Sequence, residues 1–180
     1  MSRLVGVLIV ALCAYPLAVA AQVQQGTPLS VRLPAYDTPV NLDTMETLRH
    51  HEDVMREAVF VAARKALQEL AIDMTYADSA RGIVLNPQIT AMRRIGKYRM
   101  GQILECGNNL NGAIADQFRI RMAVAVVIDS IAPSKSEFRV LIAASAQSPE
   151  GVSRPPLACG TTGFLEERIA KLIDVTIWGS

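Results

Sequence analysis

The sequence is poor in the residues that most often carry chemistry. Its 180 residues include only two histidines, one tryptophan and three cysteines, and aromatic residues make up 5%. It contains no G-x-S-x-G, H-E-x-x-H, P-loop or dinucleotide-binding motif, so the enzyme classes that those motifs identify are not indicated. It also has no Asn-x-Ser/Thr site that would mark a glycosylated eukaryotic secretory protein. We therefore predict a protein that is not an enzyme and that uses no cofactor or metal.

Neither sign of charge predominates. The chain has 18 basic and 17 acidic residues, a formal net charge of +1. Because Arg3 is the only charged residue before Gln22, the rest of the chain holds 17 residues of each sign. A balanced charge provides no broad electrostatic surface for nucleic acid or for an anionic membrane. We expect no nucleic-acid partner.

Long apolar runs are missing except at the N-terminus. There, Arg3 precedes an apolar run over residues 4–14 and a small-residue triplet that ends at Ala20. This order is typical of a secretory signal peptide, and the run is too short to span a bilayer. We predict a signal peptide over residues 1–21, cleaved near Ala20 or Ala21. The predicted product is a bacterial periplasmic or secreted protein without a transmembrane span.

Only two cysteines follow the predicted cleavage site. Cys13 lies within the apolar run, and Leu12 before it is a poor match to lipoprotein cleavage sites, so lipidation is the less favoured alternative. In an exported protein, Cys106 and Cys159 favour a disulfide, which would contribute roughly 4 kcal/mol on the chain-entropy model. A reactive thiolate or a metal site at Cys159 is the alternative. The chain has no C-x-x-C pair, and its histidines are far from both cysteines in sequence.

The part of the chain after Gln22 begins with a predicted arm and a predicted helix. Residues 22–42 contain three prolines and alternate in polarity around Leu33, which favours an extended arm with a short edge strand. Asp43 and Glu46 then have the spacing of a capping box, so we expect a long helix to begin there. The apolar positions of that helix recur at steps of three and four: Met55, Val59, Ala62, Ala63, Ala66 and Leu70.

A period of two then predicts antiparallel strands. A first hairpin turns at residues 78–82 and is expected to end at Pro87. A second, longer hairpin joins strands at 117–128 and 137–146 and shows one apolar face.

A closing helix follows the second cysteine. Its predicted inner face consists of Leu165, Ile169, Leu172, Ile173 and Thr176. Glu166 and Glu167 fall in its first turn, where they complement the helix macrodipole. The predicted fold is a single α+β domain over residues 43–178. We expect an antiparallel sheet of about four to six strands, with a long N-terminal helix and a C-terminal helix packed on one face.

Two polar segments are candidate ligand contacts. A basic run suits an anionic partner such as a lipid or glycan, and a loop rich in asparagine suits a polar ligand. The residues concerned are Arg93, Arg94, Lys97 and Arg99 in the run, and Asn108 and Asn109 in the loop. The competing interpretation, which we favour, is that both segments are solvated loops or edge strands.

The two histidines are adjacent in the sequence. On the predicted helix, His50 and His51 would point about 100° apart, which makes joint binding of one metal difficult. Together with Glu52 and Asp53 they would form an exposed site. A solvated first helical turn is the favoured interpretation.

Two segments carry a resemblance to known envelope proteins. Residues 57–90, EAVFVAARKALQELAIDMTYADSARGIVLNPQIT, resemble a helix, strand, Asp-x-x-x-Gly turn and strand unit of bacterial envelope lipoproteins, with Ala71 in place of the usual glycine. The accessory lipoprotein of the outer-membrane protein assembly machine contains such helix-grip-like units. The pairing of ECG (105–107) with ACGTTGFLEERI (158–169) resembles uncharacterised exported proteins with a Cys-Gly and a Cys-x-Thr-Gly-x-Leu-Glu segment. The resemblance implies a fold and a compartment and assigns no activity.

Two hypotheses about function follow. The first is a non-catalytic exported envelope protein, a binding or assembly-accessory module whose partner is an envelope protein, a lipid or a glycan. The alternative is a small exported hydrolase or thiol-redox protein that uses Cys159 or the pair His50 and His51.

Overall fold

The computed structural model describes residues 29–45, 47–149 and 155–179. The predicted signal peptide, its cleavage site, Cys13 and Glu46 lie outside the described residues. The helices, including short 3₁₀ turns, are η1 (Leu42–Thr44), α1 (Arg56–Glu69), α2 (Met100–Ile103), η2 (Ile114–Asp116) and α3 (Phe164–Trp178). The strands are β1 (Ser30–Val31), β2 (Val40–Asn41), β3 (Arg49–Glu52), β4 (Tyr76–Asp78), β5 (Ile83–Met92), β6 (Arg94–Ile95), β7 (Tyr98–Arg99), β8 (Leu104–Glu105), β9 (Asn108–Asn109), β10 (Gly112–Ala113), β11 (Arg119–Ala132), β12 (Lys135–Gln147) and β13 (Leu157–Thr161).

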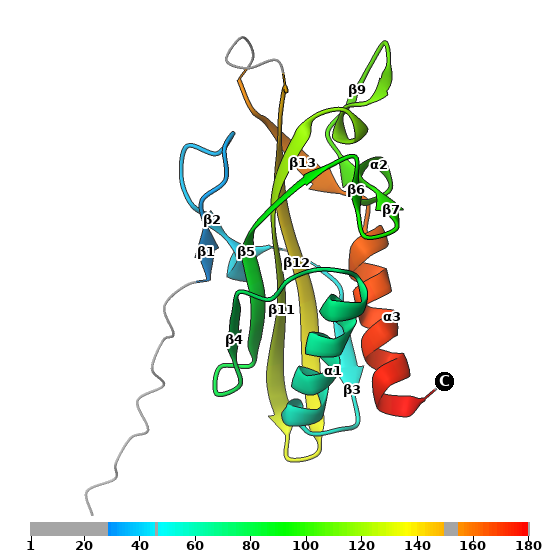
Figure 1. Ribbon diagram of the computed structural model, residues 1–180. Coiled ribbons are helices and arrows are strands. Elements are labelled where there is room, and N and C mark those ends of the chain that lie inside the picture. Colours follow the sequence, from blue (N-terminus) through cyan, green and yellow to red (C-terminus); the bar gives the residue numbers. More distant parts are fainter. Residues whose placement is uncertain (1–28, 46, 150–154, 180) are drawn as a thin grey trace, which may run out of the picture.

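An antiparallel sheet forms the centre of the molecule (Figure 1). Seven of its strands follow one another in the order β7-β6-β5-β11-β12-β13-β8, while β3 pairs with β12 and β4 pairs with β5. The long predicted hairpin is confirmed: β11 and β12 pair along their whole length, from Arg119↔Gln147 to Ala132↔Lys135. The expected four to six strands were too few, because the two-residue strands β6, β7 and β8 extend the sheet at both ends and are too short to show a polarity pattern.

Helices α1 and α3 lie side by side on one face of the sheet (Figure 1). Their apolar residues meet the even-numbered residues of β11 and β12, such as Ile120 and Phe138, in one buried core. Small side chains at Ala62, Ala63 and Ala66 of α1 are fully or almost fully buried there. This arrangement confirms the predicted α+β class with a C-terminal helix on the sheet.

The predicted start of the first helix is wrong. Residues 42–44 form only the single turn η1, where the side chain of Asn41 accepts a hydrogen bond from the backbone N–H of Asp43. Residues 49–52 form strand β3 on the edge of β12, and α1 begins only at Arg56. No long helix begins at Asp43, because the pairing of β3 with a long neighbouring strand outweighs a local capping signal.

The opposite face of the sheet is also buried, which corrects the expectation of one apolar face. Within the predicted arm, strands β1 and β2 form a small antiparallel hairpin that lies against this face (Figure 1). Side chains of the arm meet the odd-numbered residues of β11 and β12 in a second core: Leu29, Val31, Leu33, Leu42, Ala123, Ala125, Val127, Leu141 and Ala143. Alanines at three of these sheet positions let the arm approach the sheet closely.

Strand β5 continues past the proline that was expected to end it. Pro87 lies opposite an irregularity in the pairing of β5 with β11, between Met122 and Val124. A proline is tolerated at such a bulge because no regular ladder hydrogen bond is required from it. Asn86 supplies local bonds instead, since its amide donates to the Asp73 carbonyl at 2.7 Å and its Oδ1 accepts from Gln88 N–H at 2.9 Å.

Candidate functional site

The edge of strand β12 that faces away from β11 is only partly paired with other strands. Strand β3 pairs with the first part as far as Arg139, and strand β13 pairs with the last part from Ala144. Between them, residues 140–143 have β11 as their only strand partner within the described ranges. At about 3.4 Å per residue, the gap from Arg139 to Ala144 spans about 17 Å. A long strand in the middle of the sheet thus has an open edge, which native proteins usually cover.

Backbone groups of β12 point into this gap. The hydroxyl of Thr47 donates a hydrogen bond of 3.0 Å to the Val140 carbonyl, so Val140 directs its backbone groups to the open edge. Successive residues of an antiparallel strand direct these groups to alternate edges. Ile142 therefore presents its N–H and C=O to the same edge, where no described strand pairs with it.

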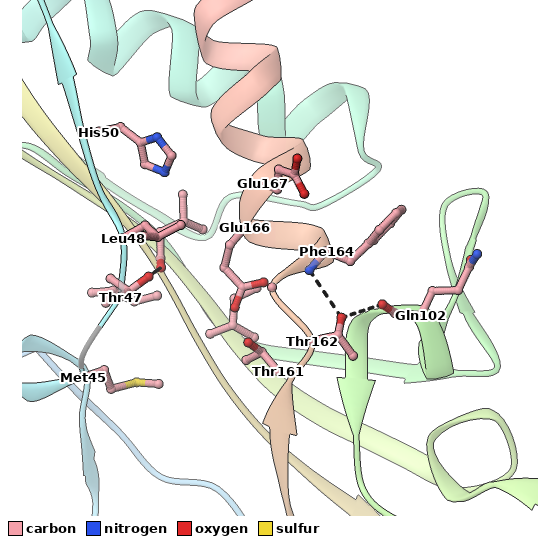
Figure 2. Close-up of a pocket in the computed structure, with 14 residues that line it drawn as sticks. Met45, Thr47, Leu48, His50, Gln102, Thr161, Thr162, Phe164, Glu166 and Glu167 are labelled. Carbon is pink, nitrogen blue, oxygen red and sulfur yellow. Dashed lines mark hydrogen bonds between the residues drawn. The ribbon is translucent and has the colours of Figure 1, made fainter.

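A cavity of about 630 Å³ lies over the gap (Figure 2). This volume is within the range of sites that bind small molecules or peptide side chains. We call the cavity the edge groove, and its lining residues are Met45, Thr47, Leu48, His50, Gln102, Val140, Leu141, Ile142, Thr161, Thr162, Gly163, Phe164, Glu166 and Glu167. The groove combines an apolar base with hydroxyl, amide and carboxylate groups.

Two walls face each other across the groove (Figure 2). The segment leading into β3 forms one wall with Met45, Thr47, Leu48 and His50, and the end of β13 and the start of α3 form the other. On the first wall, the Leu48 side chain is unusually open, with 77% of the residue exposed. An exposed leucine beside a buried apolar base extends the apolar surface that a ligand can contact.

The second wall is held by a hydrogen-bond network. The Thr162 hydroxyl donates to the Gln102 carbonyl at 2.6 Å, and the Thr162 N–H donates to the Ile103 carbonyl at 3.0 Å. The same hydroxyl oxygen accepts from the N–H of Phe164 at 3.3 Å, at the first residue of α3 (Figure 2). Thr162 therefore fixes the turn between β13 and α3 to the end of α2.

Aromatic packing supports the same wall from behind. The ring of Tyr98 meets the ring of Phe164 edge to face, with centroids 5.1 Å apart. Arg168 donates to the Tyr98 hydroxyl at 3.1 Å, and this hydrogen bond lowers the pKa of that hydroxyl. Helix α3 thus braces the β6–β7 hairpin, and Phe164 keeps one position at the groove.

The groove carries negative charge. Among the described residues, Glu166 and Glu167 are its only acidic lining residues, and no lysine or arginine lines it. Oε2 of Glu166 is buried and has no hydrogen-bond partner among the described residues, whereas Glu167 is exposed. A buried carboxylate oxygen without a donor is unfavourable and is a natural acceptor for an incoming cation or N–H group.

The predicted disulfide between Cys106 and Cys159 is confirmed, with the two Cα atoms 4.4 Å apart. Cys159 lies within strand β13, before the start of α3. The bridge joins β13 to the residue after β8, next to the pairs Gly160↔Glu105 and Thr161↔Leu104. It therefore fastens the strand that ends at the groove wall.

The structure places the basic run on the β6–β7 hairpin and uses part of it internally. Arg99 forms an ion pair of 2.5 Å with Asp116, and Arg94 donates to the Lys97 carbonyl at 3.3 Å. The Lys97 ammonium lies 5.4 Å from the centre of the Tyr98 ring. None of these cations, nor Arg93, lines the edge groove. Contact with an anionic partner there stays a prediction.

The asparagine loop forms the β9–β10 hairpin. The Asn109 and Gln117 amides exchange two hydrogen bonds, at 3.0 and 3.1 Å, and Asn109 Oδ1 also accepts from the N–H of Asn111. Asn108 pairs with Ala113 across the hairpin. Binding of a polar ligand by Asn108 and Asn109 stays a prediction, with the Asn109 side chain already engaged in its own turn.

The histidines lie on a strand, which corrects their expected place on a helix. His50 and His51 are adjacent in β3 and so project to opposite faces of the sheet. His50 stacks on Phe138 with ring centroids 4.8 Å apart and lines the edge groove. Nδ1 of His51 lies 3.7 Å from a carboxylate oxygen of Glu137.

Sequence reasoning did not find the edge groove. The groove exists because β3 and β13, more than one hundred residues apart in the chain, pair with different parts of β12 and leave a gap. No local pattern records such a gap. Of the lining residues, Glu166 and Glu167 were interpreted from the sequence, but only as residues that complement the macrodipole of the closing helix.

No protein-family model matches this chain, and no curated protein matches it. No helix in the described ranges is both long and apolar enough to cross a membrane. No group of three or more His, Cys, Asp or Glu side chains in the described part of the chain is placed to hold a metal ion.

Proposed function

We propose that this protein is a non-catalytic module of the bacterial cell envelope, exported to the periplasm or beyond, which binds another envelope component in the edge groove. The edge groove is the observation that carries the proposal. In the described part of the chain, it joins an open strand edge to an apolar base and a buried carboxylate oxygen that has no hydrogen-bond partner. Binding of a ligand that pairs with these polar groups and covers the apolar base is favourable.

The compartment has separate support. A disulfide between two distant segments persists in an oxidising environment, which in bacteria lies outside the cytoplasm. The N-terminal pattern of a signal peptide points in the same direction. The resemblance to helix-grip-like envelope domains further supports a role in binding or assembly at the envelope.

The alternative of an exported hydrolase or thiol-redox protein has less support. Cys159 is bonded to Cys106, so it offers no thiolate while the bridge is intact. His50 and His51 project to opposite faces of the sheet, and His50 is stacked on Phe138. A hydrolytic site would need a nucleophile and a base in hydrogen-bond contact, a geometry that neither histidine provides in the described residues.

Site-specific photo-crosslinking in the native bacterium tests the binding role. Leu48, which lines the groove, is replaced by a photoreactive phenylalanine analogue. The matched control carries the same analogue at Val61, which is exposed on α1. We expect a discrete adduct from Leu48 that is missing from Val61. Equal adduct patterns from both positions, or no adduct from Leu48 under conditions that label a known complex, would contradict the proposal.

Export is tested on the same cells. We expect the periplasmic fraction to contain a protein whose first residue is Ala21 or Gln22, with Cys106 and Cys159 unreactive to alkylation until a reductant is added. Recovery of the uncleaved chain in the cytoplasm with reactive thiols would contradict the envelope location.

A further inference from the structure

We propose that the edge groove receives a short extended peptide segment of a partner protein, one that carries apolar and basic side chains. The peptide adds a strand to β12 at Ile142 and places a lysine or arginine against Glu166. This inference rests on the proposed binding function and names the chemistry of the partner.

The open edge supports an extended peptide. No strand of the described ranges pairs with residues 140–143 of β12 on the groove side, and Ile142 presents both a donor and an acceptor there. Strand addition to an exposed sheet edge satisfies such groups at the regular spacing of a backbone. A compact small molecule can meet one of these groups but cannot reproduce the ladder along a gap of about 17 Å.

The charge of the groove supports basic side chains. Among the described residues, Glu166 and Glu167 are the only Asp, Glu, Lys or Arg side chains in the lining. The buried Oε2 of Glu166 has no donor among the described residues. A lysine or arginine from a partner provides a charge-assisted hydrogen bond at this atom, which is stronger than a bond between neutral groups.

The apolar lining supports alternating side chains. Of the lining residues, Met45 packs against the second core on one face of the sheet, while Glu166 belongs to α3 on the other face. Successive side chains of an added strand project to opposite faces of the sheet. A sequence in which apolar and basic residues alternate therefore meets both kinds of lining group.

The flanking strands limit the length of the occupant. Strand β3 ends the gap at Arg139 and strand β13 ends it at Ala144, so only about four residues can pair in line. A second copy that pairs edge to edge would need a longer continuous edge. The chain between the predicted cleavage site and Leu29 contains no lysine or arginine, so it does not complement the groove's charge.

Fluorescence anisotropy with synthetic peptides tests the inference on the purified, oxidised chain from Gln22 onward. The probe is a fluorescein-labelled peptide of sequence GVKVKVG. Its controls are the charge-reversed GVEVEVG and a GVKVKVG in which the central backbone nitrogens are methylated. We expect saturable binding of the lysine peptide, and a loss of about tenfold or more for each control, as a lost charge-assisted pair or ladder contact implies.

Two variants locate the contact. Glu166→Gln is expected to weaken binding of GVKVKVG by about tenfold, since it removes the charge beside the buried acceptor. Glu167→Gln, in the exposed neighbouring position, is the matched control, and a loss below about threefold is expected. Circular dichroism and thermal melting of both variants confirm that they are folded before binding is compared.

Several results would overturn the inference. Equal affinity for the lysine and glutamate peptides, no effect of backbone methylation, no binding of any peptide at millimolar concentration, or equal losses in the two variants would each do so. Self-association that is lost on Leu48→Glu and that competes with the peptide would assign the groove to a second copy instead. A Leu48 adduct in cells without peptide binding would leave the binding function standing and reject only this partner chemistry.

Discussion

The indole N–H of Trp178 donates a hydrogen bond to Oε2 of Glu52 at 2.9 Å. These residues are 126 positions apart, at the last residue of α3 and the last residue of β3. The bond ties the C-terminal end of α3 to β3, while Thr162 ties its N-terminal end to α2. Both walls of the edge groove are therefore anchored to the same helix.

Glu52→Gln is expected to flatten the dependence of the unfolding free energy on pH. Burial raises the pKa of Glu52 above its ordinary value of 4.5, and nearby Asp174 adds to the rise. A folded-state pKa above the unfolded value means that the stabilising contribution is complete below the unfolded pKa and is lost as pH rises through the folded pKa. Glutamine keeps the acceptor for Trp178 without titrating.

Urea denaturation at intervals between about pH 4 and pH 7 measures this effect. The parent chain should lose more stability than Glu52→Gln as pH rises across that interval. Glu69→Gln, on the exposed last turn of α1, serves as the control and should keep the slope of the parent. Parallel profiles for the parent and Glu52→Gln would show that the buried carboxyl does not titrate as described.

Removal of the disulfide is expected to lower the unfolding free energy by roughly 4 kcal/mol, because the bridge closes a loop between residues separated by 53 positions. The double variant Cys106→Ser/Cys159→Ser, compared with the parent by urea denaturation, measures the loss. A reductant should destabilise the parent and leave the double variant unchanged. A loss below about 1 kcal/mol would indicate that the crosslink hardly constrains the unfolded chain.

Leu42→Ala is expected to cost about 2–5 kcal/mol, because Leu42 is fully buried in the second core between the arm and the sheet. Leu48→Ala provides the matched control: Leu48 is 77% exposed, and its truncation should change stability by less than about 0.5 kcal/mol. Both changes in unfolding free energy are measured from the midpoints of denaturant unfolding, with the m-values expected to stay unchanged. Similar small costs for both variants would mean that the arm does not belong to the cooperative core.

Gly82→Ala is expected to be strongly destabilising. Gly82 has a φ of +66°, and an added Cβ would lie 2.1 Å from the Ile128 carbonyl oxygen, a backbone atom that cannot turn away. The left-handed conformation costs about 1–3 kcal/mol for a residue with a side chain, and overpacking adds about 1–3 kcal/mol. Gly112→Ala is the control, since its φ is +107° but no atom lies within 4 Å of the added Cβ.

Thermal melting of the two glycine variants separates the contributions. The control should show the conformational cost alone, and Gly82→Ala should melt at a clearly lower temperature. Equal melting temperatures would show that the turn beside Ile128 moves aside at little cost.

Local patterns in the sequence were sufficient for several features. The period-two alternation of β11 and β12 identified the central hairpin, and the apolar positions of α3 at Leu165, Ile169 and Ile173 are buried as expected. The two cysteines left after the predicted signal form the predicted bridge. Each of these features depends on neighbouring residues or on a single pairing choice, so no knowledge of the tertiary arrangement was needed.

Other features were predicted wrongly because contacts with segments distant in the sequence outweighed the local sequence pattern. Asp43 and the residues after it read as a helix start, but β12 offered an edge that β3 paired with. The hairpin was expected to have one apolar face, but the arm covers Ala123 and Ala143 on the other face, where small side chains allow close approach. Pro87 was read as a strand end, but a bulge in β5, where residues 87 and 88 face the single residue Ala123 of β11, accommodates it.

The sequence by itself determined the central hairpin, the closing helix and the disulfide. Side-chain periodicity and the number of cysteines can be read directly from the sequence. Only the tertiary structure decided the second core and the edge groove. Both arise where segments far apart in the chain meet β12: the arm on its face, and β3 and β13 on its edge. The length of edge left between β3 and β13 depends on where each strand stops, and that is set by contacts with the rest of the fold.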